Sequence, residues 1–274
     1  MNTVDEYLKE ILMKNGSDLH LLAGDPARVR IYGDLMPLRG DKDLPANDVK
    51  KMIYEIMTDP IRRVFEQHEG ADFAYSLDNK ARFRVNVFRH LGGIGAVFRA
   101  IPAETVTLEK LAMPGPVGDM CRQKQGLILV TGKTGSGKST TLAAMVDEIN
   151  STRNGHIITI EDPIEFLHER KRCLISQREV GMHTKSFADA LHSALREDPD
   201  VVLVGELRDL ETISIAVTAA ETGILVMGTL HTNGAAPTVD RMINQFEAEK
   251  QTQIRTMLST SLRGVISQQL CKRA

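Results

Sequence analysis

The stretch GLILVTGKTGSGKSTT, residues 126–141, contains a glycine-rich loop between an apolar run and a segment with helical periodicity. Gly132, Gly137, Lys138 and Ser139 match the phosphate-loop pattern G-x-x-x-x-G-K-[ST]. A chance glycine turn is the alternative, but the apolar run predicts a buried parallel strand before the loop. A helix is predicted after it, because apolar residues recur at helical spacing: Leu142, Met145, Val146 and Ile149. The sequence therefore predicts a nucleoside triphosphate site.

The residue types of this loop suit a polyphosphate. Glycine lacks a Cβ, so Gly132, Gly135 and Gly137 can adopt positive φ and bring N–H groups against phosphate oxygens. The helix N-terminus adds about half a positive charge. We expect Lys138 to reach the β- and γ-phosphates of ATP and Ser139 to bind Mg²⁺. The predicted nucleotide contacts are Gly132, Lys133, Thr134, Gly135, Ser136, Gly137, Lys138, Ser139 and Thr140.

Composition is that of a soluble protein with one large domain or two smaller ones. The chain has 274 residues, of which 42% are hydrophobic. No apolar run is long enough for a bilayer, and the first residues, MNTVDEYLKE, are too charged for a signal peptide. Its 3 cysteines lack metal-ligand spacing and indicate reduced thiols. We therefore expect a cytoplasmic protein with no direct membrane insertion.

The charge balance does not favour a nucleic acid as partner. Net charge is −2 and aromatic residues make up 4% of the chain, so neither a basic field nor stacking platforms are evident. A local basic groove remains open at this stage.

The first hundred residues have the pattern of a small α+β domain. In ARFRVNVF, residues 81–88, apolar side chains alternate with Arg82, Arg84 and Asn86, which predicts a strand with one apolar and one cationic face. Residues 101–118 contain the densest proline and glycine punctuation, and we predict a linker there. The predicted domains are thus residues 1–100 and 119–274.

After the linker, strand and helix patterns alternate, which is typical of a mostly parallel sheet with helices on both faces. The predicted strands after the loop are HIITI, VVLV and ILVMGT. The last predicted helix has an apolar stripe that runs from Ile254 to Val265. The expected fold class is α/β with a mostly parallel sheet, preceded by a smaller α+β domain.

Polar residues follow three of these strands, at the edge where open α/β sheets bind ligands. Glu161 and Glu165 follow the first, Glu206 follows the second, and His231 follows the third. We expect Glu161 or Glu165 to orient the attacking water and Glu206 to lie near Mg²⁺. Solvated loop carboxylates are the alternative for any one of them.

His231 is either a γ-phosphate sensor or a structural histidine, and spacing leaves both open. Arg196, Arg208 and Arg241 have the positions of helix-end or salt-bridge residues. Arg84 and Arg99 are candidate cations for the triphosphate, although the sequence alone favours a solvated strand face.

Six motifs closely resemble the PilT-type ATPases that power type IV pilus retraction, within the secretion ATPase superfamily. They occur in this order: GKTGSGKS, TIEDPIEF, SQREVG, ALREDPDVVLVGELRDLET, AAETG and GTLHT. The resemblance extends to the first domain through GSDLHLLAG, RFRVNVFR and GAVFRAIP, and hence over nearly the whole chain.

The resemblance implies a PAS-like N-terminal domain, a RecA-like ATPase domain and a homohexamer with ATP between the two domains. It makes Glu161, Asp162, Glu165, Glu206 and His231 catalytic-site candidates, with Glu165 preferred as general base. It also implies that Arg84 and Arg99 approach phosphates. The implied partners are a pilus platform protein of the inner membrane and the pilus machinery, at the cytoplasmic face of that membrane.

Two positions depart from the family pattern. Ile224 stands where the family commonly has a histidine after AAETG, which puts coupling through that histidine in doubt. The sequence also stops at SQQLCKRA, where family members continue into a helical region with an AIRNLIRE motif. This leaves open whether the chain is a fragment or a short relative.

The predicted function is that of a hexameric Mg-ATP-hydrolysing motor for type IV pilus retraction and twitching motility, driven by domain closure. Two alternatives remain at this stage. One is a nucleotide-binding ring subunit with little hydrolysis, and the other is a RecA-like nucleic-acid translocase.

Overall fold

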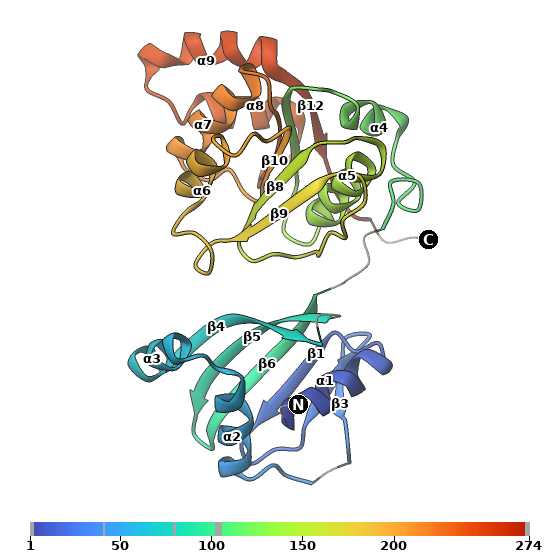
Figure 1. The fold of residues 1–274 in the computed structure, drawn as a ribbon, viewed down its shortest axis with the longest axis vertical. Helices are drawn as coiled ribbons and strands as arrows, with labels where there is room; N and C mark the ends of the chain where they lie inside the picture. Colours follow the sequence, from blue (N-terminus) through green and yellow to red (C-terminus); the bar gives the residue numbers. More distant parts are fainter. Residues whose placement is uncertain (1–2, 41, 79–80, 102–105, 272–274) are drawn as a thin grey trace. The chain divides into compact units, whose positions relative to one another are not determined.

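A computed structural model describes residues 3–40, 42–78, 81–101 and 106–271 (Figure 1). The chain divides into two compact units, Met1–Ala103 and Glu104–Ala274. Each unit has its own sheet and its own core, and each is described by itself.

The first unit is built on a fully antiparallel sheet of order β3-β2-β1-β6-β5-β4. Its elements follow in chain order: α1 (Thr3–Met13), β1 (Asp18–Leu22), β2 (Arg28–Ile31), β3 (Asp34–Pro37), α2 (Ala46–Ile56), α3 (Asp59–His68), β4 (Gly70–Leu77), β5 (Ala81–His90) and β6 (Gly93–Ile101).

One face of this sheet forms the core with the three helices. Phe83, Val85 and Val87 of β5 are buried among the apolar stripes of α1 and α2, whereas Arg84 and Asn86 are exposed on the other face. The predicted alternation of an apolar and a cationic face along β5 is confirmed.

The predicted linker, residues 101–118, is partly helical. α4 (Gly115–Cys121) begins with Pro114 as its N-cap and Pro116 in its first turn, where the missing N–H of proline costs no hydrogen bond. Val117 is buried. The part of the predicted linker at residues 102–105 lies outside the described residues.

The second unit contains a fully parallel sheet of order β12-β7-β11-β10-β8-β9. Its further elements are β7 (Gly126–Thr131), α5 (Lys138–Thr152), β8 (His156–Glu161), β9 (Leu174–Glu179), α6 (Phe187–Ala194), β10 (Val201–Val204), α7 (Leu210–Glu221), β11 (Leu225–Leu230), α8 (Ala235–Ile243), α9 (Ala248–Ser261) and β12 (Leu262–Ser267).

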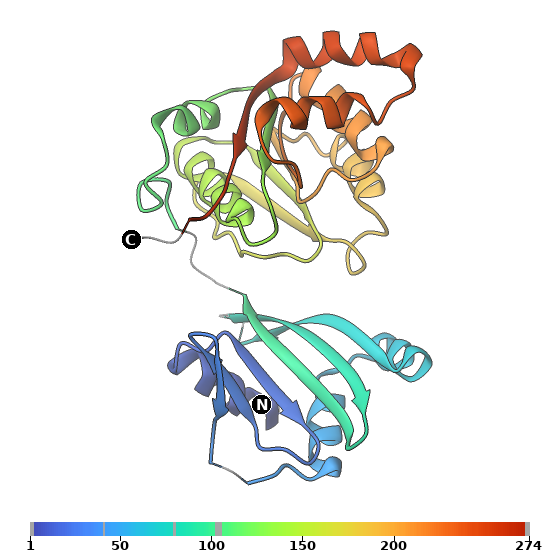
Figure 2. The same cartoon turned by 180° about the vertical axis from the view of Figure 1, so that it is seen from behind.

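Helices cover both faces of this sheet. α4 and α5 pack on one face, and α6 to α9 pack on the other, as the two views show (Figure 2). All residues of β7, β10 and β11 are buried, because these strands are sandwiched between the two helical layers. The predicted α/β class with a mostly parallel sheet is confirmed.

The prediction of one helix through Val265 is wrong. α9 ends at Ser261, and the following residues form β12 along β7. Val265 and Ile266 are β-branched and favour a strand. At Gly264 a Cβ would lie 2.2 Å from Cε of Met120 in α4, so glycine permits the helix to pack there. The polar strand β9 was also absent from the sequence prediction.

Candidate functional site

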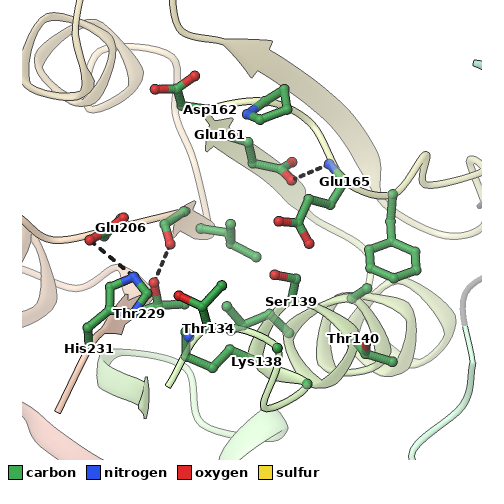
Figure 3. A pocket seen from close by; sticks show the side chains of 18 of the residues that line it. Thr134, Lys138, Ser139, Thr140, Glu161, Asp162, Glu165, Glu206, Thr229 and His231 are labelled. Atoms are coloured by element: carbon green, nitrogen blue, oxygen red, sulfur yellow. Dashed lines mark hydrogen bonds and ion pairs between the residues drawn. The ribbon is translucent and has the colours of Figure 1, made fainter. Parts of the chain in front are cut away.

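The carboxyl ends of β7, β8, β10 and β11 border a pocket with a volume of 660 Å³ (Figure 3). Parallel sheets place ligands at this edge, because the loops after the strands converge there. Side chains from the phosphate loop, from α5 and from the three strand ends line it. The pocket brings together all the catalytic-site and magnesium candidates of the sequence: Lys138, Ser139, Glu161, Asp162, Glu165, Glu206 and His231.

The phosphate loop has the backbone conformation that its glycines predict. Gly132, Gly135 and Gly137 have φ of 144°, 77° and 89°, and Gly137 precedes α5 as its N-cap. Close contact also requires glycine at position 132, where a Cβ would lie 2.3 Å from the carbonyl oxygen of Gln268. The loop is thus fixed against the segment after β12.

Lys138 is buried at the start of α5. Its Nζ donates hydrogen bonds to the carbonyl oxygens of Gly132 at 2.9 Å and Lys133 at 3.1 Å. Burial lowers its pKa, while the charges of Glu206 and Glu165 act in the opposite direction. The ammonium therefore lies between the loop backbone and the carboxylates of the pocket.

The structure separates the predicted nucleotide-contact residues into two groups. Those that line the pocket are Thr134, Gly135, Gly137, Lys138, Ser139 and Thr140. Gly132, Lys133 and Ser136 shape the loop without lining the pocket, and the buried Ser136 hydroxyl has no hydrogen-bond partner among the described residues.

Glu161 and Glu165 differ in their surroundings although both follow β8. The carboxylate of Glu161 accepts hydrogen bonds from Thr159 Oγ1 at 2.6 Å and from the backbone N–H of Glu165 at 3.3 Å. Burial raises its pKa, and these hydrogen bonds only partly oppose the rise. Glu165 is exposed, and its carboxylate points into the pocket toward Ser139 (Figure 3). Of the two carboxylates, that of Glu165 is the more exposed to solvent.

Glu206 lies after β10 between a guanidinium group and an imidazole ring. Oε2 lies 2.6 Å from Nη2 of Arg208, and Oε1 lies 3.4 Å from Nε2 of His231. Thr229 at the end of β11 donates its hydroxyl to the carbonyl of Gly205, which joins the ends of the two strands. His231 and Glu206 are therefore held side by side at the pocket wall.

Arg84 and Arg99 belong to the first unit, where they line a pocket of 490 Å³ with Asp72 and Asn86. Nε of Arg99 lies 2.8 Å from Oδ1 of Asp18, and Nε of Arg84 lies 4.0 Å from Oδ1 of Asp72. Both guanidinium groups thus face carboxylates of their own unit. The approach to phosphates implied for them stays a prediction.

The sequence reasoning missed several pocket residues. His168, Phe187 and Leu270 line the pocket outside every motif, and Phe166 lines it as the last residue of TIEDPIEF, to which no role was assigned. Burial lowers the pKa of His168 to about 4, so its imidazole is neutral at physiological pH. Arg208 was placed among candidate salt-bridge residues, and its position two residues after Glu206 was the available signal.

Ile224 lies at the opposite end of β11 from His231. Its backbone precedes the first residue of the strand, and its half-buried side chain packs against the apolar cluster that the sheet forms with α6 to α9. The position at which the chain departs from the family pattern, Ile224, therefore faces the core and does not line the pocket.

The donor atoms at the pocket suit Mg²⁺. A hydroxyl at Ser139 and an ionised carboxylate at Glu206 are hard oxygen ligands, which magnesium prefers together with phosphate oxygens and water. No group of three or more metal-binding side chains occurs among the described residues. Such a site relies on the nucleotide for its remaining ligands.

The chain is similar to proteins of pilus and secretion systems along its whole length. A family model described as "Type II/IV secretion system protein" matches residues 1–274. The "Type IV pilus retractation ATPase PilT" of Pseudomonas aeruginosa is 52% identical over 270 residues, which cover 98% of this chain and 78% of that protein. A "Twitching motility protein" of Neisseria gonorrhoeae is 53% identical over 244 residues, which cover 89% of this chain and 65% of that protein.

Solved structures of ATPases are also similar to this chain in fold. The pilus retraction motor PilT with bound ADP superimposes with a TM-score of 0.93 at 49% identity, over 97% of this chain and 78% of that chain. The Legionella pneumophila ATPase DotB superimposes with a TM-score of 0.82 at 32% identity, over 94% of this chain and 73% of that chain. Within the described residues, no helix combines the length and apolar character needed to cross a bilayer. On the strength of the family match over residues 1–274 and the 52% identity to PilT of Pseudomonas aeruginosa, the chain belongs to the type II/IV secretion system protein family and to its PilT-type ATPases.

Proposed function

We propose that the chain hydrolyses Mg-ATP as a subunit of a homohexameric motor that drives type IV pilus retraction. The observation that carries this proposal is the convergence of Lys138, Glu165, Glu206 and His231 on one pocket above a phosphate loop. The relatives support the motor assignment, since one is a pilus retraction ATPase and another a twitching motility protein.

Each side chain has a role that its position supports. Lys138 binds the β- and γ-phosphates, and Ser139 and Glu206 hold Mg²⁺, which when bound supplies positive charge against the phosphate oxygens. Glu165 orients a water molecule and accepts its proton as the water oxygen attacks the γ-phosphorus, while the bond from that phosphorus to the β,γ-bridging oxygen breaks and ADP leaves. His231, beside Glu206, is placed to respond to the γ-phosphate. Glu161 holds the backbone of Glu165, because its carboxylate accepts a hydrogen bond from the backbone N–H of Glu165 at 3.3 Å.

In the motor, domains at residues 1–100 and 119–274 close about the segment between them when ATP binds. Arg84 and Arg99 complete the phosphate site of a neighbouring subunit. The ring acts at the cytoplasmic face of the inner membrane on a pilus platform protein. This part of the proposal rests on the family membership.

Phosphate release from Mg-ATP over a series of protein concentrations tests the proposal. We expect activity per chain to rise steeply with concentration, because sites are completed between subunits, and we expect Lys138→Ala to abolish turnover. Bound ATP without turnover at every concentration would contradict hydrolysis. Turnover at the wild-type rate in Lys138→Ala would contradict the role of the phosphate loop.

Mixing two inactive variants tests the contribution of a neighbouring subunit. Arg84→Ala alone is expected to lose roughly a thousandfold in turnover if Arg84 acts like an arginine finger. Mixed with Lys138→Ala, it would regain activity at sites that combine Lys138 of one chain with Arg84 of another. An inactive mixture in which both variants still assemble would contradict a role in trans.

A further inference from the structure

The segment between β8 and β9, residues 162–173, contains no helix or strand, yet it carries Glu165. Ile164 on one side of Glu165 is buried, whereas Glu165 itself is exposed at the pocket. A segment without its own backbone ladder needs other partners for its N–H and C=O groups. The side chains that supply these partners also determine where the Glu165 carboxylate points.

Two side chains of β9 bind the backbone on both sides of Glu165. Glu179 Oε2 accepts a hydrogen bond from the N–H of Ile164 at 3.2 Å. Gln177 Oε1 accepts one from the N–H of His168 at 2.9 Å, and its Nε2 donates one to the carbonyl of Phe166 at 2.9 Å. A single strand therefore binds the backbone on both sides of Glu165, at Ile164 before it and at Phe166 and His168 after it.

The geometry of β9 explains how both side chains reach this segment. Residues two apart on a strand project from the same face, so Gln177 and Glu179 lie side by side. In the parallel register Gln177 is opposite Thr159 and Glu179 is opposite Glu161. The side chains of all four residues thus share the face of the sheet that α5 covers.

The side-chain amide of Gln177 both donates and accepts a hydrogen bond, which neither a carboxylate nor an ammonium group can do. Its amide offers a donor and an acceptor, and the segment presents one carbonyl, at Phe166, and one N–H, at His168. The same Nε2 lies 3.4 Å from Oε1 of Glu161. Since Glu161 also accepts the N–H of Glu165 at 3.3 Å, Gln177 connects both carboxylate-bearing positions.

The far end of the segment is fixed independently by α5. Asn150 is 1% exposed, donates to the carbonyl of Glu169 at 2.7 Å, and accepts the N–H groups of Lys171 at 3.3 Å and Cys173 at 3.2 Å. The contacts of Gln177 and Glu179 therefore govern the part of the segment nearest Glu165.

We propose that Gln177 is a positioning residue for Glu165: with Glu179, it holds the backbone that aims the Glu165 carboxylate at the pocket. This inference rests on the proposed hydrolysis of ATP. It assigns a role to the SQREVG motif, which the nucleotide contacts described above leave without one. Because neither side chain lines the pocket, the role acts on turnover and not on nucleotide binding.

The substitution Gln177→Glu provides a sharp test. The ionised carboxylate keeps the acceptor for His168 but loses the donor to Phe166 and places a negative charge beside Glu161. We expect kcat to fall by about ten- to a hundredfold, since small misplacements of a catalytic group have effects of this size. The dissociation constant for a fluorescent ADP analogue is expected to stay within about twofold of wild type, since the phosphate loop is untouched.

A pH profile separates positioning from a loss of fold. As pH falls, the new carboxyl protonates and regains an O–H donor, so the ratio of variant to wild-type kcat is expected to rise toward acid pH. Gln177→Ala is expected to show a constant low ratio. Gln253→Glu, the same change on an exposed residue of α9, is the matched control and should behave as wild type.

Hydrogen exchange gives a readout without turnover. In Gln177→Ala the N–H of His168 loses its acceptor, so a peptide spanning residues 164–170 is expected to exchange faster, while peptides of the phosphate loop exchange as in wild type. Thermal unfolding of each variant reports whether the fold is intact.

The outcomes separate this inference from the proposed function. A wild-type protein that binds ATP without turnover would overturn the proposed function. In that case hydrogen exchange still tests the positioning role, which would be overturned if residues 164–170 exchanged at the wild-type rate in Gln177→Ala. With an active wild type, wild-type kcat in Gln177→Ala would overturn the positioning role alone. So would a nucleotide affinity that falls in parallel with kcat, because Gln177 would then act on binding.

Discussion

The guanidinium of Arg208 lies against the carboxylate of Glu206, with 2.6 Å between Nη2 and Oε2. Burial alone raises the pKa of Glu206. The hydrogen bond and charge of Arg208, together with the charges of His231 and Lys138, outweigh burial and hold this pKa below its usual value. Glu206 therefore stays ionised at neutral pH, which suits a ligand for Mg²⁺.

The substitution Glu206→Gln removes this charge while keeping the shape of the side chain. We expect ATP to bind and turnover to fall by about ten- to a hundredfold, because metal-site partners have effects of this size. Phosphate release and binding of a fluorescent ATP analogue measure the two quantities. Glu221→Gln, exposed at the end of α7, is the control. Loss of ATP binding in Glu206→Gln would show that the proposed role is wrong.

Glu161 is expected to make stability depend on pH in the opposite sense to Glu206. Its pKa is raised above the ordinary value of 4.5, mainly by burial, so the folded state binds its proton more tightly than the unfolded state does. Its contribution to stability is therefore greatest below the ordinary value, and it is lost as pH rises through the raised folded pKa.

In Glu161→Gln this titration is absent. The free energy of unfolding of the variant, relative to wild type, is expected to increase from the ordinary glutamate value of 4.5 upward and then level off. Urea unfolding at a series of pH values between about 4.5 and 8 measures it. A constant difference across this range would mean that Glu161 titrates alike in the folded and unfolded states.

Gly132→Ala tests the contact between the phosphate loop and the segment after β12. The new Cβ would lie 2.3 Å from the carbonyl oxygen of Gln268, at a φ of 144° that alanine rarely adopts. We expect a loss of about 1–3 kcal/mol in the free energy of unfolding and weaker ATP binding.

Gly118→Ala is the matched control for this change. Gly118 lies in α4, and a Cβ there meets no heavy atom within 4 Å. Because alanine favours the helix, the variant is expected to be equally stable or more stable by up to about 1 kcal/mol. Equal stability losses in the two variants, measured by urea unfolding, would contradict the steric explanation.

The three thiols are expected to differ in reactivity. Cys121 and Cys173 are buried, and burial raises the pKa of Cys121 to about 12 and also raises that of Cys173. Cys271 is exposed. A thiol reagent at pH 8 should modify Cys271 rapidly and the other two only after unfolding, because the thiolate is the reactive form. Mass spectrometry of peptides identifies the modified residues. Rapid modification of Cys121 in the folded protein would contradict this packing.

The sequence predicted the phosphate loop and the parallel sheet because their signals are local. Strand, glycines and helix follow one another within residues 126–149, and the carboxylates come directly after their strands. β12 was mistaken for helix because Leu262 and Val265 continue the apolar spacing of α9. Its strand state depends on pairing with β7, more than a hundred residues earlier, which no local pattern contains.

β9 escaped prediction for a related reason. LISQRE mixes apolar and polar residues, and its polar side chains bond to the segment that carries Glu165, to His156 and to Glu197. Gln177 therefore gives no recognisable signal until the parallel register with β8 places it beside Phe166 and His168. For Arg208, the sequence indicated a helix-end or salt-bridge residue, and the structure identifies Glu206, two residues earlier, as its partner.

The pairing of β12 with β7 also has a mechanical consequence. The two strands are parallel, and they pair at five positions from Leu262 to Ser267, with a further bond from the N–H of Gln268 to the carbonyl of Thr131. Tension applied to the backbone beyond Ser267 and resisted by the sheet would load these bonds together in shear, and they would not open one at a time like a zipper. The strand that ends at the phosphate loop is thus the first part of the sheet to bear that load.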